Sequence, residues 1–196
     1  MTSNIVTIAE VSEVIIADHP DPDIINVKLA AFIKSFGDYQ RRTTNVRANM
    51  TPWLVESPQT KILKQWIWGL LKLEEEPMSE FAWSLYHLFG NVYHKGDFTI
   101  KHAHFPATFS FLYFVKCVPT TSPLVLTHSN YKVEPKAGRV AIFPSHIHHR
   151  VPVLVDDDDE RITMSGNIVG GFLYDSLVCV TDTLTGHGVE WKKLNN

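Results

Sequence analysis

The chain has 196 residues, of which 44% are hydrophobic and 20% charged, and its formal net charge is −3. These values are close to the averages for globular proteins, so they exclude a disordered chain, a collagen-like chain and a basic tail that coats nucleic acid. The length fits a single domain, residues 1–196. Because the chain is mildly acidic, we expect neither a nucleic-acid partner nor an anionic membrane as a partner.

The two cysteines, Cys117 and Cys179, are too few for a disulfide framework and lack the spacing of a zinc site. They could form one disulfide, but two buried thiols in a reducing cytoplasm are the favoured interpretation. The sequence contains no apolar stretch near 18 residues and shows no secretory signal at its N-terminus. We therefore expect a cytoplasmic protein, in the host cytoplasm if a phage encodes it.

The first 81 residues predict a helical layer that follows a short β segment. Residues 5–17 are rich in Val and Ile and predict one or two short strands. Helical periodicity then runs from Ile24 to Phe36, after a start signal at Asp21. A second helix is predicted over 58–76, where Ser57 and the following proline form a favourable N-terminus.

From about residue 82 the pattern changes to short apolar runs that alternate with turn signals. Many short strands at this spacing favour an antiparallel sandwich or barrel. We therefore predict a mainly β fold in which the N-terminal helices (1–81) support a β core (82–181). The acidic run 156–160 reads as a solvated hairpin tip. The predicted strands cover the runs 83–94, 109–117, 124–127, 131–134, 139–144, 148–154, 161–169 and 172–181.

Histidine is the residue that is unevenly distributed, since six of the ten histidines fall between His102 and His149. In a strand, residues two apart point to the same face, so His102 and His104 could reach one metal ion. A third ligand must come from another strand. The segment that contains His146, His148 and His149 can supply it, although strand alternation allows only one parity to point inward.

A second group of polar residues follows the acidic run. Arg161, Thr163, Ser165 and Asn167 share one face of a predicted strand. An arginine beside a threonine suits a carboxylate, because a guanidinium binds it through two hydrogen bonds and the hydroxyl adds a third. Together with the histidines, this predicts a site that holds a metal and an organic acid.

Between about Asn91 and Asn167 the sequence resembles the Fe(II)- and 2-oxoglutarate-dependent oxygenases. The most similar group comes from bacteria and tailed phages and is related to the prolyl hydroxylases. This resemblance implies a double-stranded β-helix, a cupin-like jelly roll. The matching segments are NVYHKGDFTIKHAHFP, FSFLYFV, EPKAGRVAIFPSHIHHRVPV and RITMSGN.

The resemblance also implies a ligand set. His102 corresponds to the proximal iron ligand, and His149, followed by Val151 and Pro152, corresponds to the distal one. The family usually places Asp or Glu two residues after the proximal histidine. Here that position holds His104, which we take as the third ligand although it departs from the usual triad.

The resemblance further assigns the binding of 2-oxoglutarate. Arg161 corresponds to the arginine that binds the far carboxylate, with Thr163 as its hydroxyl partner. Tyr113 and Asn91 lie on flanking strands where the family often places further contacts. The spacing of twelve residues from His149 to Arg161 is longer than usual. An insertion of even length would keep Arg161 facing inward, whereas an odd one would need a bulge.

The activity implied by the resemblance is the hydroxylation of a substrate C–H bond, coupled to the conversion of 2-oxoglutarate and dioxygen into succinate and CO2. Fe(II) and 2-oxoglutarate are the expected cofactors. Three neutral imidazoles would leave the iron its full double charge, which favours an anionic co-ligand. The substrate is expected to be a small molecule or a protein side chain, and the sequence does not choose between them.

Two other interpretations stay open. The first is a cupin-type three-histidine metal enzyme, because Gly96 and the His102–His104 pair match the start of the first cupin motif. The glutamate of that motif is missing, since Thr108 and Phe109 stand in its place, and the second cupin motif is absent. The other is a non-catalytic β-helix module. Iron content and succinate production would separate these interpretations.

Overall fold

The computed structural model describes residues 12–37, 39, 44–73, 81–155, 160–172, 177–181 and 189–193, and only the backbone at 81, 172 and in the last two ranges. Within these residues the chain is mainly β with two helices, α1 (Pro22–Lys34) and α2 (Pro58–Leu71). The strands are β1 (Ile15–Asp18), β2 (Val46–Arg47), β3 (Asn49–Met50), β4 (Phe81–Tyr93), β5 (Phe98–His102), β6 (Phe109–Lys116), β7 (Leu124–Leu126), β8 (Tyr131–Val133), β9 (Arg139–Pro144), β10 (His149–Val151), β11 (Arg161–Phe172), β12 (Leu177–Thr181) and β13 (Val189–Lys193).

Two antiparallel sheets face each other across an apolar interior. The first sheet has the strand order β1-β9-β6-β11-β4-β3, and the second has the order β2-β5-β10-β7-β8. One core cluster joins them, because Phe89 and Leu112 of the first sheet pack with Leu124 and Val151 of the second. The predicted mainly β fold with antiparallel sheets is therefore confirmed, and the arrangement is consistent with a jelly roll.

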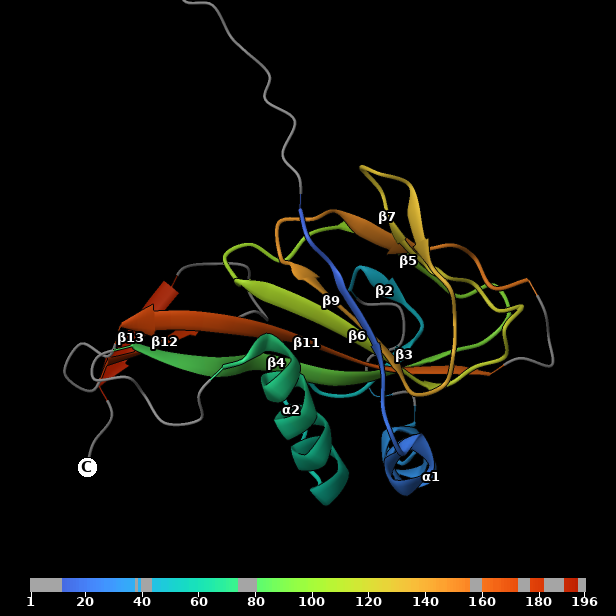
Figure 1. Cartoon of the computed structure of the whole chain (residues 1–196), viewed down its shortest axis with the longest axis horizontal. Coiled ribbons are helices and arrows are strands. Elements are labelled where there is room, and N and C mark those ends of the chain that lie inside the picture. Colours follow the sequence, from blue (N-terminus) through green and yellow to red (C-terminus); the bar gives the residue numbers. More distant parts are fainter. Residues whose placement is uncertain are drawn as a thin grey trace, which may run out of the picture.

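Both helices lie on the outer face of the first sheet, opposite to the second sheet (Figure 1). α1 contributes Ile25, Leu29 and Ile33 to a core cluster beneath the helices. Gly90 of β4 allows the close approach of α1, since a Cβ atom there would lie 2.5 Å from Cγ1 of Ile33. Among the described residues, no helix is long and apolar enough to cross a membrane.

The helices begin close to their predicted positions for identifiable reasons. In α2 the Ser57 side chain accepts a hydrogen bond from the Thr60 backbone, and the Thr60 side chain accepts one from the Ser57 backbone. This helix ends before residue 76, because Lys72 adopts a left-handed conformation that ends the hydrogen-bond ladder. Residues 74–80 lie outside the described residues.

The N-terminal part contains the strand predicted within 5–17, since β1 lies at its end and pairs with β9, while residues 5–11 lie outside the described part. It also supplies two strands that were not predicted: β3 pairs with β4 in the first sheet, and β2 pairs with β5 in the second. β2 and β3 have only two residues each, so they carry no periodicity that a sequence pattern could reveal. Cys117 is half-buried, and the side chain of Cys179 lies outside the described part.

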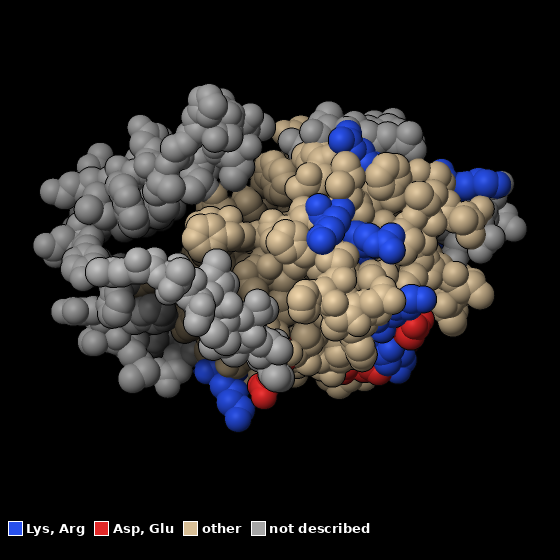
Figure 2. Space-filling view, turned by 90° about the horizontal axis from the view of Figure 1, so that it is seen from above, with Lys and Arg blue, Asp and Glu red and all other residues tan. Residues whose placement is uncertain are grey.

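Strand alternation separates the charged surface of the second sheet from its interior. Lys101 and Arg150 are exposed on the outer face, whereas the neighbouring His102 and His149 point between the sheets. Figure 2 looks onto this side of the molecule and shows more lysine and arginine than acidic side chains in its described part. The histidines are thus held by strands whose opposite face is solvated.

Candidate metal centre

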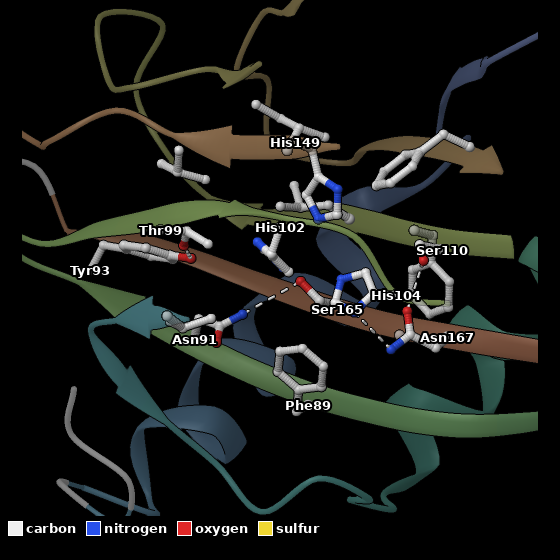
Figure 3. A pocket seen from close by; sticks show the side chains of 17 residues that line it. Phe89, Asn91, Tyr93, Thr99, His102, His104, Ser110, His149, Ser165 and Asn167 are labelled. Carbon is white, nitrogen blue, oxygen red and sulfur yellow. Dashed lines mark hydrogen bonds between the residues drawn. The ribbon is translucent and has the colours of Figure 1, made fainter. Parts of the chain in front are cut away.

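Three histidines meet between the two sheets. His102 ends β5 and pairs directly with His149, the first residue of β10. His104 follows β5 and is held by its backbone N–H, which donates to the carbonyl of Ser145 at 2.8 Å. Each of the three side chains offers a ring nitrogen, and these nitrogens lie within 4.8 Å of one another. The structure therefore brings together all three predicted metal ligands (Figure 3).

Hydrogen bonds to the backbone select one tautomer for two of these histidines. Nδ1 of His102 lies 2.7 Å from the carbonyl of Ile100, and Nδ1 of His149 lies 3.0 Å from the carbonyl of Ile147. A carbonyl can only accept, so each Nδ1 carries the hydrogen. The lone pair is then on Nε2, the nitrogen left for a metal, as is usual for histidine ligands in proteins.

Burial keeps the three imidazoles neutral. Burial, with a smaller contribution from the neighbouring imidazoles, lowers the pKa of His104 to about 2 and the pKa of His149 to about 3. Burial also lowers the pKa of His102. Neutral imidazole is the form that binds a metal, so the cluster needs to release no proton at neutral pH before an ion enters.

Arg161 is completely buried in the same interior. Its guanidinium packs on two rings, with its central carbon 4.7 Å from the centre of Tyr93 and 5.1 Å from that of Phe114. None of its three nitrogens has a hydrogen-bond partner among the described residues. Burial lowers the pKa of Arg161, because it penalises the charged form. An unpaired buried charge costs several kcal/mol, which a bound carboxylate would offset.

The adjacent acid does not neutralise this arginine. Glu160 instead forms ion pairs with Lys34 at 2.8 Å and Lys116 at 3.0 Å. Residues 156–159, the rest of the predicted acidic hairpin tip, lie outside the described residues. Within the described part of the chain, Arg161 is therefore buried and belongs to no surface ion pair.

Thr163 and Asn91 lie opposite each other on β11 and β4, on the same face as Arg161. The Asn91 amide donates to the hydroxyls of Thr163 at 3.3 Å and Ser165 at 3.4 Å. Its oxygen is buried and has no partner among the described residues. Asn91 also lines a small pocket, with a cavity volume of about 30 Å³, together with the three histidines.

Tyr113 does not reach this pocket. It lies on the opposite face of β6, beneath the helices, where its hydroxyl donates to the side chain of Asn26 in α1 at 2.8 Å. Burial raises the pKa of Tyr113. The expected contact of Tyr113 with 2-oxoglutarate is therefore not supported by its position, because β6 is buried on both faces and the sequence could not identify the inward parity.

Two residues to which the sequence assigned no role of their own belong to the surroundings of the centre. Nδ2 of Asn167 lies 3.4 Å from Nδ1 of His104 and 3.1 Å from Nδ1 of His87. The shared face with Arg161 was a signal for Asn167, but His87 becomes visible only through the pairing of β4 with β11. The remaining histidines of the region are exposed; they are His94, His128, His146 and His148.

The comparisons with known proteins identify the fold. No family model and no curated protein sequence matches the chain. Among solved structures, the chain is similar to a viral collagen prolyl hydroxylase from Paramecium bursaria Chlorella virus 1, which was solved in complex with 2-oxoglutarate. The two have a TM-score of 0.60 and 13% sequence identity, and the match covers 79% of this chain and 94% of the hydroxylase. The chain has the fold of the 2-oxoglutarate- and iron-dependent oxygenases.

Two further structures agree. A prolyl-4-hydroxylase from Pseudomonas putida has a TM-score of 0.58 and 14% identity, and covers 80% of this chain and 91% of its own. HygX from Streptomyces hygroscopicus, solved with nickel and 2-oxoglutarate, has a TM-score of 0.55 and 11% identity. The match covers 81% of this chain and 82% of HygX. The resemblance seen in the sequence is thus confirmed at the level of the fold.

Proposed function

We propose that the protein is an Fe(II)- and 2-oxoglutarate-dependent dioxygenase that hydroxylates a small molecule or a protein side chain. The single observation that carries this proposal is Arg161, a buried arginine without a partner among the described residues. It lies on the same face of β11 as residues that line the pocket of the three histidines. Arg161 does not itself line the pocket, but its ring partner Tyr93 does, so a donor for a carboxylate lies directly behind the wall of a pocket that holds donors for a divalent metal.

The metal would be held by the Nε2 atoms of His102, His104 and His149. Three protein ligands leave coordination positions open for a second molecule that binds through oxygen. Fe(II), when bound, would supply the activation of dioxygen, which side chains alone cannot perform. The imidazoles contribute no negative charge, so the centre would attract the anionic C1 carboxylate of 2-oxoglutarate.

Arg161 would bind the C5 carboxylate of 2-oxoglutarate. Its guanidinium can donate two parallel hydrogen bonds to one carboxylate, and Tyr93 and Phe114 hold it in place. Thr163 would add its hydroxyl, which now accepts from Asn91 and still has its own hydrogen to donate. Asn91 would contribute only after rotation of its amide, through its N–H groups, because 2-oxoglutarate offers no hydrogen to an amide oxygen.

The apolar lining would keep water away from the reacting groups. The ring of Phe143 lies 4.8 Å from that of His149, and Phe89 and Leu124 line the same pocket. A dry pocket strengthens the interaction of the guanidinium with the carboxylate, because the local dielectric constant is low. It also protects a reactive oxidant from side reactions with solvent.

The set of three imidazoles also suits a cupin-type metal enzyme, and it is the observation that favours this second candidate. A buried arginine without a partner has no role in that candidate, whereas it has one in the binding of 2-oxoglutarate. The two candidates, and a non-catalytic module, differ in whether 2-oxoglutarate is consumed.

The test is aerobic incubation of the Fe(II)-loaded protein with 2-oxoglutarate and mixed candidate substrates, with succinate as the readout. At a 2-oxoglutarate concentration near the dissociation constant of the wild type, we expect succinate from the wild type and far less from Arg161→Ala. Ser122→Ala is the control, because the Ser122 hydroxyl donates a hydrogen bond to the carbonyl of Val153 and does not line the pocket. Equal succinate from the wild type and Arg161→Ala would reject the assigned role of the arginine.

A further inference from the structure

The side chain of Asn167 joins two imidazoles inside the protein. Asn167 is 3% exposed and lies on β11. Its Nδ2 atom is 3.4 Å from Nδ1 of His104 and 3.1 Å from Nδ1 of His87, and its Oδ1 atom accepts from Oγ of Ser110 at 2.8 Å. Figure 3 shows the bond between Asn167 and His104 at the edge of the histidine cluster.

The second imidazole, His87, is held firmly in place. It pairs with Asn167 across β4 and β11, and its ring packs on Tyr86 at 4.1 Å and on Trp53 at 5.0 Å between ring centres. Because the backbone pairing and these ring contacts fix both residues, the Asn167 amide has little freedom except rotation about its own axis.

Metal binding places a strict demand on His104. A neutral imidazole has one N–H, so its hydrogen and its lone pair lie on different nitrogens. If the Asn167 amide donates to Nδ1, the hydrogen lies on Nε2, and this nitrogen cannot bind a metal. If Nε2 binds the metal, Nδ1 carries the hydrogen and needs an acceptor. The carbonyls of Ile100 and Ile147 meet the same demand for His102 and His149.

The amide of Asn167 can become that acceptor by a half-turn that exchanges its oxygen and nitrogen. Oδ1 would then accept from Nδ1 of both His104 and His87, and Nδ2 would donate to Ser110. The Ser110 hydroxyl can follow this change, because it lies 2.7 Å from Oγ of Ser145 and either oxygen can be the donor. The exchange therefore keeps the partners of the amide paired.

We propose that Asn167 is a positioning residue for the metal centre, whose amide oxygen accepts from Nδ1 of His104 and so directs Nε2 of that ring to the metal. A carboxylate at position 104 would not need such help, because every oxygen lone pair can bind an ion. An imidazole needs it, because only one tautomer can. This inference rests on the metal site of the proposed function, and it does not depend on 2-oxoglutarate or on hydroxylation.

The experiment compares Zn²⁺ affinity among variants by competition with a chelator. Asn167→Leu keeps the shape but has no acceptor, and we expect its dissociation constant for Zn²⁺ to rise about 10- to 100-fold. In Asn167→Asp one carboxylate oxygen can accept from the imidazoles and the other from Ser110. We expect this variant to stay within a few-fold of the wild type. A Leu variant that binds Zn²⁺ as tightly as the wild type would overturn the proposal.

A merely structural role would give a different result, because a buried aspartate would then lose as much Zn²⁺ affinity as leucine. ¹⁵N NMR of the Zn²⁺-loaded wild type reads the tautomer directly and needs no variant to fold. We expect a hydrogen on Nδ1 of His104 and zinc on Nε2, and zinc on Nδ1 would overturn the proposal. Zinc binding that depends on Asn167, without turnover of 2-oxoglutarate, would support this inference and reject the proposed function.

Discussion

Arg161 and Tyr93 are direct neighbours across β11 and β4, and the guanidinium carbon lies 4.7 Å from the centre of the tyrosine ring. Both side chains are buried, and the guanidinium nitrogens have no hydrogen-bond partner among the described residues. The stacking fixes the plane of the guanidinium without using its donors. Its hydrogen-bonding capacity is thus left unused by the described residues.

We predict that Arg161→Ala weakens the binding of 2-oxoglutarate about 30-fold or more and leaves Fe(II) affinity nearly unchanged. Truncating one partner of a buried charge pair costs about 2–5 kcal/mol, and 2 kcal/mol corresponds to a factor of about 30. Anaerobic calorimetry with Fe(II)-loaded protein measures both affinities. Unchanged affinity for 2-oxoglutarate would remove Arg161 from the site and favour the cupin and non-catalytic interpretations.

We predict that His149→Ala abolishes tight metal binding. Two remaining imidazoles rarely hold a divalent ion against water, and His149 also pairs with His102 across the second sheet. Metal content after dialysis gives the measurement, with His148→Ala as the control because that neighbouring side chain is exposed. One tightly bound iron per chain in His149→Ala would contradict the ligand assignment.

We predict that the metal-free protein loses stability as the pH falls from about 6.5 towards 5. Burial lowers the pKa of His104 to about 2 and the pKa of His149 to about 3 in the folded protein. In the unfolded chain a histidine side chain has a pKa of about 6.5. Below about pH 6.5 the unfolded chain therefore binds protons at these two histidines that the folded protein does not bind. Since the unfolded state then binds more protons, the free energy of unfolding rises with pH in this window and falls on acidification.

The slope gives this prediction a quantitative test. Each such histidine contributes up to about 1.4 kcal/mol per pH unit, so His104→Asn should lower the slope by about that amount. Urea unfolding at several pH values between 5 and 6.5 measures it, in a range where carboxylates stay ionised. Equal slopes for the wild type and His104→Asn would show that His104 titrates normally in the folded protein.

We predict that Tyr113→Phe destabilises the protein by about 0.5–1.5 kcal/mol and leaves the affinity for 2-oxoglutarate unchanged. The variant loses the hydrogen bond to Asn26, which joins β6 to α1 on the face away from the pocket. Thermal unfolding and ligand calorimetry on the same sample separate the two effects. A large loss of 2-oxoglutarate affinity would mean that Tyr113 acts in the site after all.

The sequence predicted the elements best where a local pattern was long. Both helices were expected because their periodicity spans several turns and their first residues carry start signals, as the Ser57 capping box shows. β2 and β3 were missed because two residues cannot carry a pattern, and their pairing depends on contacts with strands about 40 to 50 residues away.

The site could be predicted where strand alternation was enough. The common face of Arg161 and Thr163 followed from their spacing, and the structure places both completely inside. The contact expected of Tyr113 rested on the resemblance alone, and alternation could not check it, because β6 is apolar on both faces and either parity looks buried. No sequence pattern pointed to His87, since the contact of this residue with Asn167 depends on the register between β4 and β11.

The most direct measurement for the proposed function is an anaerobic titration of the Fe(II)-loaded protein with 2-oxoglutarate, followed by visible absorption. Binding through the C1 carboxylate and keto oxygen should give a charge-transfer band that saturates at one equivalent per chain. The same titration with Arg161→Ala should need about 30-fold more ligand. A protein that holds one Fe(II) in its histidine cluster, yet shows no band and no binding of 2-oxoglutarate, would contradict the proposed function.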